Sequence, residues 1–108
     1  MRYYAARSSV ARVNDPSLLI LTSLSSGAKH GHALLLDIDE FAGVRLGPGT
    51  LYGAITRLEE RGLIEPLDAD ERRRPYRLTP TGTAALADSL SGLRRVVDVG
   101  TTRLAAAT

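Results

Sequence analysis

The chain has 108 residues, of which 44% are hydrophobic and 24% charged, so it has the size and composition of one globular domain rather than of a disordered chain. It contains no cysteine, which excludes disulfide frameworks, thiolate zinc sites and thiol nucleophiles and favours a reducing, cytoplasmic compartment. The net charge is only +2, so bulk charge does not indicate a nucleic-acid partner, and no apolar run exceeds four residues, far from the roughly 20 that span a bilayer.

The first half of the chain carries helical periodicity in three successive segments. The first helix is expected to begin at Asn14 or Asp15 and to end near Gly27, the second covers 31–42, and the third runs over 48–62. Each has one apolar face, made by Leu18, Leu21 and Leu24 in the first helix, Leu34, Leu35, Ile38 and Phe41 in the second, and Leu51, Ile55 and Leu58 in the third. Three such faces can enclose a small aliphatic core.

Two short apolar segments follow the third helix, at 63–67 and 76–79, with the charged stretch 68–74 between them. This pattern predicts a β-hairpin with a polar tip. Helices followed by a hairpin are the element order of a winged helix-turn-helix. The predicted fold class is therefore mainly α with a small β-hairpin.

From Pro80 onward the apolar residues alternate by four and three, which is the pattern of a heptad seam. The seam consists of Leu86, Leu90, Leu93, Val97, Gly100 and Leu104. A stripe of this length would stay exposed on so small a domain, so a second copy is the expected cover and a homodimer is predicted. The alternative is that the stripe packs on the first helix of its own protomer.

The predicted organisation has three parts. Residues 1–13 form either a short helix or a basic arm, residues 14–79 form the winged helix-turn-helix domain, and residues 80–108 form the dimerisation helix.

Three stretches carry motifs in a fixed order: LSSGAKHGHALLLDI, LGPGTLYGAITRLEERGLIEP and RRRPYRLTPTG. Together they resemble the PadR family of winged-helix transcriptional regulators, over roughly residues 18–90. The most specific parts are the His30–Gly31 pair, the run from Pro48 to Tyr52, and the Tyr-x-Leu-Thr strand after the arginine cluster. The sequence departs from the family pattern at three positions, with His32 in place of tyrosine, Gly53 in place of proline and Gly47 in place of serine.

The resemblance implies a regulator that binds DNA, often represses, and leaves DNA when a small molecule binds. The third helix should then lie in the major groove, since the second helix of a helix-turn-helix pair reads base edges near its N-terminus. The residues expected to meet DNA phosphates there are Pro48, Gly49, Thr50 and Tyr52. Thr56 and Arg57 are the candidates for base readout, because a guanidinium binds guanine bidentately. Alternatively, Glu60 holds Arg57 away from DNA.

The predicted hairpin carries four arginines, namely Arg72, Arg73, Arg74 and Arg77. They are expected to contact backbone phosphates or a narrow minor groove. Asp68, Asp70 and Glu71 precede the cluster, so the alternative is a solvated turn in which the charges neutralise one another.

Catalysis and metal binding are not expected. His30 and His32 would point roughly 200° apart on a helix, which prevents them from sharing one ion. The hydroxyls near the end of the first helix, from Ser23 to Ser26, fit capping, and no nucleophile, base and orienting group stand together.

The expected partners are double-stranded DNA, a second copy of the chain and a small-molecule effector whose site the sequence does not reveal. No cofactor and no membrane are expected. The rival hypothesis is a winged helix that contacts another protein, and the salt dependence of DNA binding discriminates between the two.

Overall fold

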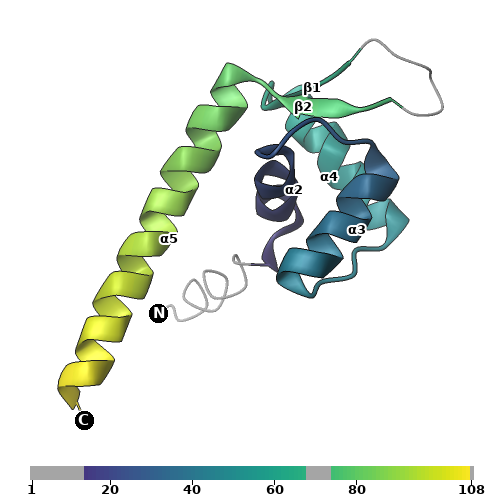
Figure 1. Cartoon of the computed structure of the whole chain (residues 1–108). Coiled ribbons are helices and arrows are strands. Elements are labelled where there is room, and N and C mark those ends of the chain that lie inside the picture. The colour runs from purple at the N-terminus through teal and green to yellow at the C-terminus, as the bar shows by residue number, and fades with distance from the viewer. Residues whose placement is uncertain (1–13, 68–73, 108) are drawn as a thin grey trace, which may run out of the picture.

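The computed structural model describes residues 14–67 and 74–107. Its elements are α2 (Pro16–Leu24), α3 (Gly31–Ala42), α4 (Pro48–Glu60), β1 (Ile64–Pro66), β2 (Tyr76–Leu78) and α5 (Pro80–Ala107). Figure 1 shows α2, α3, α4 and the hairpin gathered in one body, from which the long helix α5 extends. The predicted fold class, a winged helix-turn-helix followed by a C-terminal helix, is confirmed.

Local sequence signals set the helix ends. Pro16 and Pro48 occupy the first turns of α2 and α4, where a missing N–H costs no hydrogen bond. Gly43 ends α3 with a left-handed φ of 68°, a conformation that favours glycine. Helix α2 ends at Leu24, earlier than Gly27 predicts, because the next hydroxyls turn back to the last carbonyls: Ser25 donates to Thr22 and Ser26 to Ser23.

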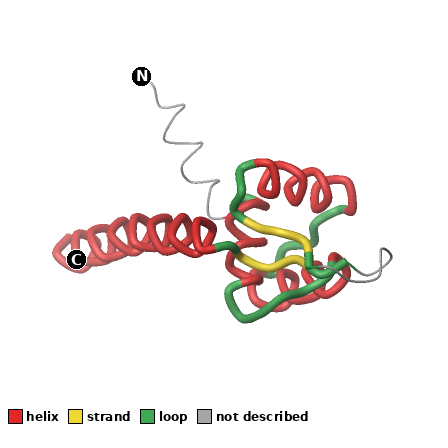
Figure 2. Tube along the Cα trace, turned by 90° about the horizontal axis from the view of Figure 1, so that it is seen from above, coloured by secondary structure: helices red, strands yellow, loops and turns green. Residues whose placement is uncertain are grey.

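The wing is an antiparallel pair in which Ile64 lies opposite Leu78, Glu65 opposite Arg77, and Pro66 opposite Tyr76. Figure 2 shows the two strands side by side, with α5 following β2 away from the body. Lys29, in the connector between α2 and α3, adds a backbone bridge to Tyr76, with N–O distances of 3.1 and 2.9 Å. This bridge, which the sequence did not predict, fixes the wing to the helix-turn-helix.

The core lies where α2 meets α3, α4, β2 and the start of α5. It is aliphatic, as predicted, and consists of Leu19, Ile20, Leu21, Leu24, Leu34, Ile38, Leu51, Ala54, Ile55, Leu58, Leu63, Ile64 and Leu86. Ser23 is also buried, and its hydroxyl donates to Oδ2 of Asp37 at 2.6 Å. The pair satisfies a hydroxyl that would be costly to bury alone, and it joins α2 to α3.

Two predicted positions of apolar side chains differ from the structure. Phe41 was expected on the buried face of its helix but is 46% exposed, because it lies on the last turn of α3, where the neighbouring elements no longer cover it. Leu86 was expected in the dimer seam but is 5% exposed, because the first turns of α5 pack on α2 and β2 of the same protomer. The exposed part of the seam therefore begins at Leu90.

Within the described ranges, no helix is both long enough and apolar enough to cross a membrane.

Candidate nucleic-acid interface

Helix α4 presents one face to the core and the other to solvent. Leu51, Ala54, Ile55 and Leu58 are buried. The residues expected to touch DNA from this helix are all exposed, namely Pro48, Gly49, Thr50, Tyr52, Thr56 and Arg57. The first-turn N–H groups of Gly49 and Thr50 precede the first intrahelical bond, which runs from the Leu51 amide to the Gly47 carbonyl. The start of α4 therefore has free donors and the positive end of the helix dipole at the surface.

Tyr52 links the two helices of the helix-turn-helix. A Cβ added to Gly31 would overlap the Tyr52 hydroxyl, so the phenol of α4 occupies the space beside the first residue of α3. Tyr52 is nevertheless 50% exposed. The contact between Gly31 and Tyr52 thus gives a structural reason for two of the sequence motifs, the His30–Gly31 pair and the run from Pro48 to Tyr52. Sequence reasoning assigned Tyr52 a phosphate contact and missed its second contact with Gly31.

The two candidates for base readout lie one turn beyond the start of α4. The Thr56 hydroxyl donates to the Tyr52 carbonyl at 2.9 Å, so its proton is used within the helix. The Arg57 side chain runs back along α4, and its Nη1 would be 3.5 Å from a Cβ added to Gly53. Among the described residues no ion pair joins Arg57 to Glu60, so the alternative in which Glu60 holds this arginine is not what the structure shows.

The wing holds Arg74 and Arg77 in different surroundings. Arg74 is exposed. Arg77 forms an exposed ion pair across the strands with Glu65, with Nε 2.8 Å from Oε2. This partner of Arg77 could have been found in the sequence, since a hairpin centred on the charged stretch sets Glu65 opposite Arg77. Arg72 and Arg73, which were also predicted to contact DNA, lie outside the described residues.

Tyr76 stands where the wing approaches α4. Burial raises the pKa of its phenol above the ordinary value, and the Glu59 carboxylate and Tyr52 raise it further, whereas the Arg74 guanidinium lowers it. Tyr76 of the wing therefore lies close enough to Glu59 and Tyr52 of α4 for both to act on its phenol. The structure places Tyr76 of the wing near Tyr52 of α4, and a joint contact of the wing arginines and α4 with DNA stays a prediction.

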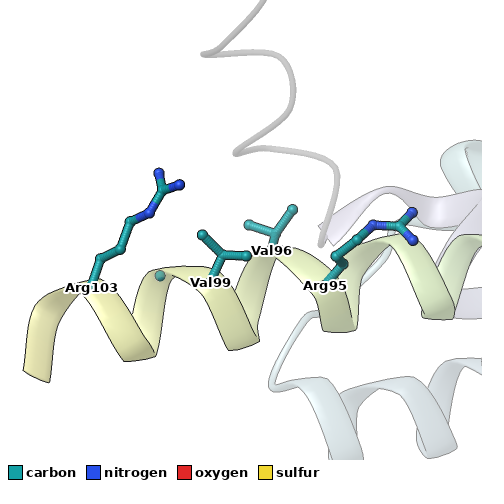
Figure 3. A pocket seen from close by; sticks show the side chains of 5 residues that line it. Arg95, Val96, Val99 and Arg103 are labelled. Carbon is teal, nitrogen blue, oxygen red and sulfur yellow. The ribbon is translucent and has the colours of Figure 1, made fainter.

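Helix α5 exposes an apolar stripe beyond the body of the domain. Of the seam residues there, Leu90, Val97 and Leu104 are exposed, Val97 by 62% and Leu104 by 71%, whereas Leu93 and Gly100 are half-buried. Next to the seam is an open groove of about 350 Å³, lined by Arg95, Val96, Val99, Gly100 and Arg103. In Figure 3 the two arginines stand at either end of the two valines. The groove is apolar along its floor and cationic at its ends.

Residues 14–67 and 74–107 contain no group of three or more His, Asp or Glu side chains that could hold a metal ion. His30 is the N-cap residue of α3, in an extended conformation, and His32 is exposed. The serines have ordinary structural partners, since Ser25 and Ser26 bond to the end of α2 and Ser23 bonds to Asp37.

The helix-turn-helix, the strand pair after it and the exposed second helix define a winged helix-turn-helix protein. Residues 20–88 match the family of PadR-like transcriptional regulators, and the chain belongs to this family. The predicted resemblance is therefore confirmed, and the family consists of transcriptional regulators rather than enzymes.

Three relatives illustrate the match. The chain is 42% identical over 85 residues to a 37.1 kDa protein of transposon TN4556 from Streptomyces fradiae. The aligned segment covers 79% of this chain but 25% of that protein, so the chain spans about a quarter of that relative's length. It is 39% identical over 82 residues to the transcriptional regulator Rv3488 of Mycobacterium tuberculosis, covering 73% and 76% of the two chains. The crystal structure of a PadR family transcription regulator from Clostridium difficile R20291 is 26% identical, with a TM-score of 0.74 over 82% of this chain and 97% of that one.

Proposed function

We propose that this protein is a sequence-specific transcriptional repressor that binds a palindromic DNA operator as a homodimer and is released by a small-molecule effector. The observation that carries the proposal is the exposed face of α4, which presents free amides, hydroxyls and Arg57 beside the wing in a member of a family of transcriptional regulators.

The proposed contacts divide between phosphates and bases. The amides at Gly49 and Thr50, with the hydroxyls of Thr50 and Tyr52, suit phosphate oxygens at a helix N-terminus, with Pro48 opening the helix toward them. Thr56 and Arg57 face the groove one turn further along and carry base readout. On the wing, Arg72, Arg73 and Arg74 contribute phosphate contacts, and Arg77 contributes less because Glu65 already neutralises it.

The homodimer is supported by the exposed seam of α5. Leu90 and Leu104 each lie seven residues from Val97, so two antiparallel copies of α5 crossing at Val97 would place each leucine against the partner's other leucine. In this register Leu93 of one copy would lie one residue out of direct opposition to Gly100 of the other. A twofold dimer presents two copies of α4, and the half-sites of its operator should be separated by about 10 bp or a multiple.

Repression and effector release rest on the family likeness. No residue is assigned to effector binding. A promoter reporter with and without the protein distinguishes repression from activation.

The DNA-binding function is tested by selecting fragments from sheared genomic DNA of the host with purified protein at two salt concentrations. Recovery of a palindromic sequence near a promoter, with binding that weakens log-linearly as salt rises, is the expected result. Folded, dimeric protein that recovers nothing selective would instead favour the second candidate, a winged helix that contacts another protein.

A further inference from the structure

The outer row of α4 lacks side chains at two successive turns, at Gly49 and Gly53. We propose that Gly53 is the specificity-determining position of the reading helix, because the guanidinium of Arg57 takes the place of its missing side chain and presents its donors to a guanine in the major groove. This inference rests on the proposed DNA-binding function and goes beyond it by naming Gly53 as the residue that permits Arg57 to recognise a guanine.

The geometry of α4 places Arg57 over Gly53. The two residues are four apart on a 13-residue helix and therefore lie on the same side, one turn from each other. Nη1 of Arg57 is the side-chain atom nearest to the position of a Gly53 Cβ, at 3.5 Å. A methyl group would thus touch the guanidinium at ordinary van der Waals distance, whereas a longer side chain would occupy its place.

The direction of the Arg57 side chain matters for reading DNA. By lying back toward Gly53, the guanidinium moves toward the N-terminal end of α4, where a recognition helix makes its base contacts. Among the described residues no ion pair involves this guanidinium. The bare helix surface at Gly49, where nothing lies within 4 Å of an added Cβ, also lets the groove edge approach the backbone closely.

The chemistry of the neighbouring side chain narrows the choice of base. The Thr56 hydroxyl donates its hydrogen bond to the Tyr52 carbonyl, so toward DNA it offers only acceptor lone pairs and a methyl group. Arg57 has donors and no acceptor, and guanine is the base with two major-groove acceptors, O6 and N7, spaced for a planar fork. The pair should therefore select a guanine, with a thymine methyl or a base amino group beside it for Thr56.

The test compares Gly53→Ala, Gly53→Leu, Arg57→Ala and the double variant Gly53→Leu/Arg57→Ala with the wild type. Each base pair of the operator selected by the wild type is replaced in turn, and binding is measured by fluorescence anisotropy at one salt concentration. Alanine and leucine both favour helix more than glycine, so circular dichroism should show α4 intact in every variant.

For the wild type and Gly53→Ala, replacing one guanine in each half-site should weaken binding about tenfold or more. Gly53→Leu and Arg57→Ala should bind the original and the replaced operators equally well, while still binding bulk DNA through phosphates. The double variant should lose no more discrimination than Arg57→Ala alone, because both changes remove the same contact.

Gly53→Leu with an unchanged guanine preference would overturn the role of Gly53, and Arg57→Ala with an unchanged preference at every position would overturn the whole inference. In both cases the wild type still selects an operator, so the proposed function stands. A wild type that selects no sequence would overturn the proposed function, and this inference with it.

Discussion

Tyr52 and Gly31 lie against each other where α3 and α4, the two helices of the helix-turn-helix, meet. An added Cβ at Gly31 would overlap the Tyr52 hydroxyl. Because Tyr52 is 50% exposed, its side chain has room to move away. We expect Gly31→Ala to push the phenol outward and to lower the free energy of unfolding by about 1 kcal/mol, the lower end of overpacking costs. In a Tyr52→Ala background the same substitution should cost nothing, so urea unfolding of the double-mutant cycle measures the contact. Additive effects of the two substitutions would show that the residues are independent.

Tyr76 is a second residue whose surroundings lead to a measurable effect. Its phenol has a raised pKa in the folded state, from burial first and then from Glu59 and Tyr52, against the opposing Arg74. The folded protein therefore holds this proton more tightly than the unfolded chain does, so the associated stability is present below pH 10.0, the ordinary pKa, and is lost as pH rises through the folded-state pKa.

We expect Tyr76→Phe to lose less stability than the wild type between pH 9 and pH 11. Thermal or urea unfolding over this range checks this expectation, with Tyr52→Phe measured alongside because Tyr52 contributes to the raised pKa of Tyr76. If the stability of the wild type and of Tyr76→Phe falls in parallel as pH rises, the Tyr76 phenol does not contribute to the loss of stability at alkaline pH.

At the scale of elements, the joint between the wing and α5 is tightly built. The Thr79 hydroxyl donates to the Gly62 carbonyl at 2.6 Å and accepts from the Gly82 amide at 3.0 Å, so it caps α5 and attaches it to the turn after α4. The Thr79 amide donates to the Leu63 carbonyl at 3.1 Å. These bonds fix the angle at which α5 leaves the winged domain.

Gly82→Ala should break this joint, because the new Cβ would overlap the Leu63 carbonyl, which is backbone and cannot swing aside. We expect a loss of at least about 2 kcal/mol in the free energy of unfolding. Gly92→Ala is the matched control on the same helix, since nothing lies within 4 Å of its added Cβ, and it should leave stability unchanged or raise it by up to about 1 kcal/mol. Equal effects of the two substitutions in urea unfolding would contradict the proposed close contact.

The wing supplies a prediction about charge. Glu65→Gln removes the partner of Arg77, so this guanidinium becomes available to a phosphate. We expect tighter binding to all DNA sequences and a slope of log affinity against log salt that is steeper by up to about 0.9. Glu40→Gln is the control, because it removes the same charge from an exposed carboxylate on α3 that takes part in neither ion pair of the described residues. If both variants gain affinity equally, the gain reflects net charge and not the freed arginine.

The elements differ in how far the sequence predicted them. Helices α3 and α4 and the start of α5 follow proline, glycine and apolar spacing, which are local signals, and the sequence predicted them closely. The Lys29 bridge to Tyr76 and the fit of Gly82 against Leu63 are contacts between distant parts of the chain, so no local pattern marks them. Periodicity likewise indicates which face of a helix is apolar but not what covers it, which is why Phe41 and Leu86 were misplaced.

At the scale of the whole molecule, α5 determines how two winged domains would be arranged. Its 28 residues correspond to roughly 42 Å of helix, and only the first turns, as far as Leu86, are buried in the protomer. The remaining turns carry Leu90, Val97 and Leu104 in the exposed seam. Since the Thr79 and Gly82 joint fixes α5 to the domain, pairing through α5 would set the separation of the two reading helices and hence the spacing of operator half-sites.

Leu93→Asp and Val97→Asp should therefore convert the proposed dimer into monomers, because each places a charge in the middle of the seam. Val97 is 62% exposed in the protomer, so Val97→Asp should leave the winged domain folded. Operator affinity should fall steeply while weak binding to a single half-site persists, since each protomer keeps its own α4 and wing.

Light scattering and anisotropy on full and half operators measure the two effects separately. Thr102→Asp is the control, because it adds the same charge on α5 about 140° away from Val97 and should leave the dimer intact. A dimer that survives both seam substitutions would place the interface elsewhere on the chain. Loss of the dimer without loss of operator affinity would instead mean that one protomer reads the whole site, so the operator need not be palindromic.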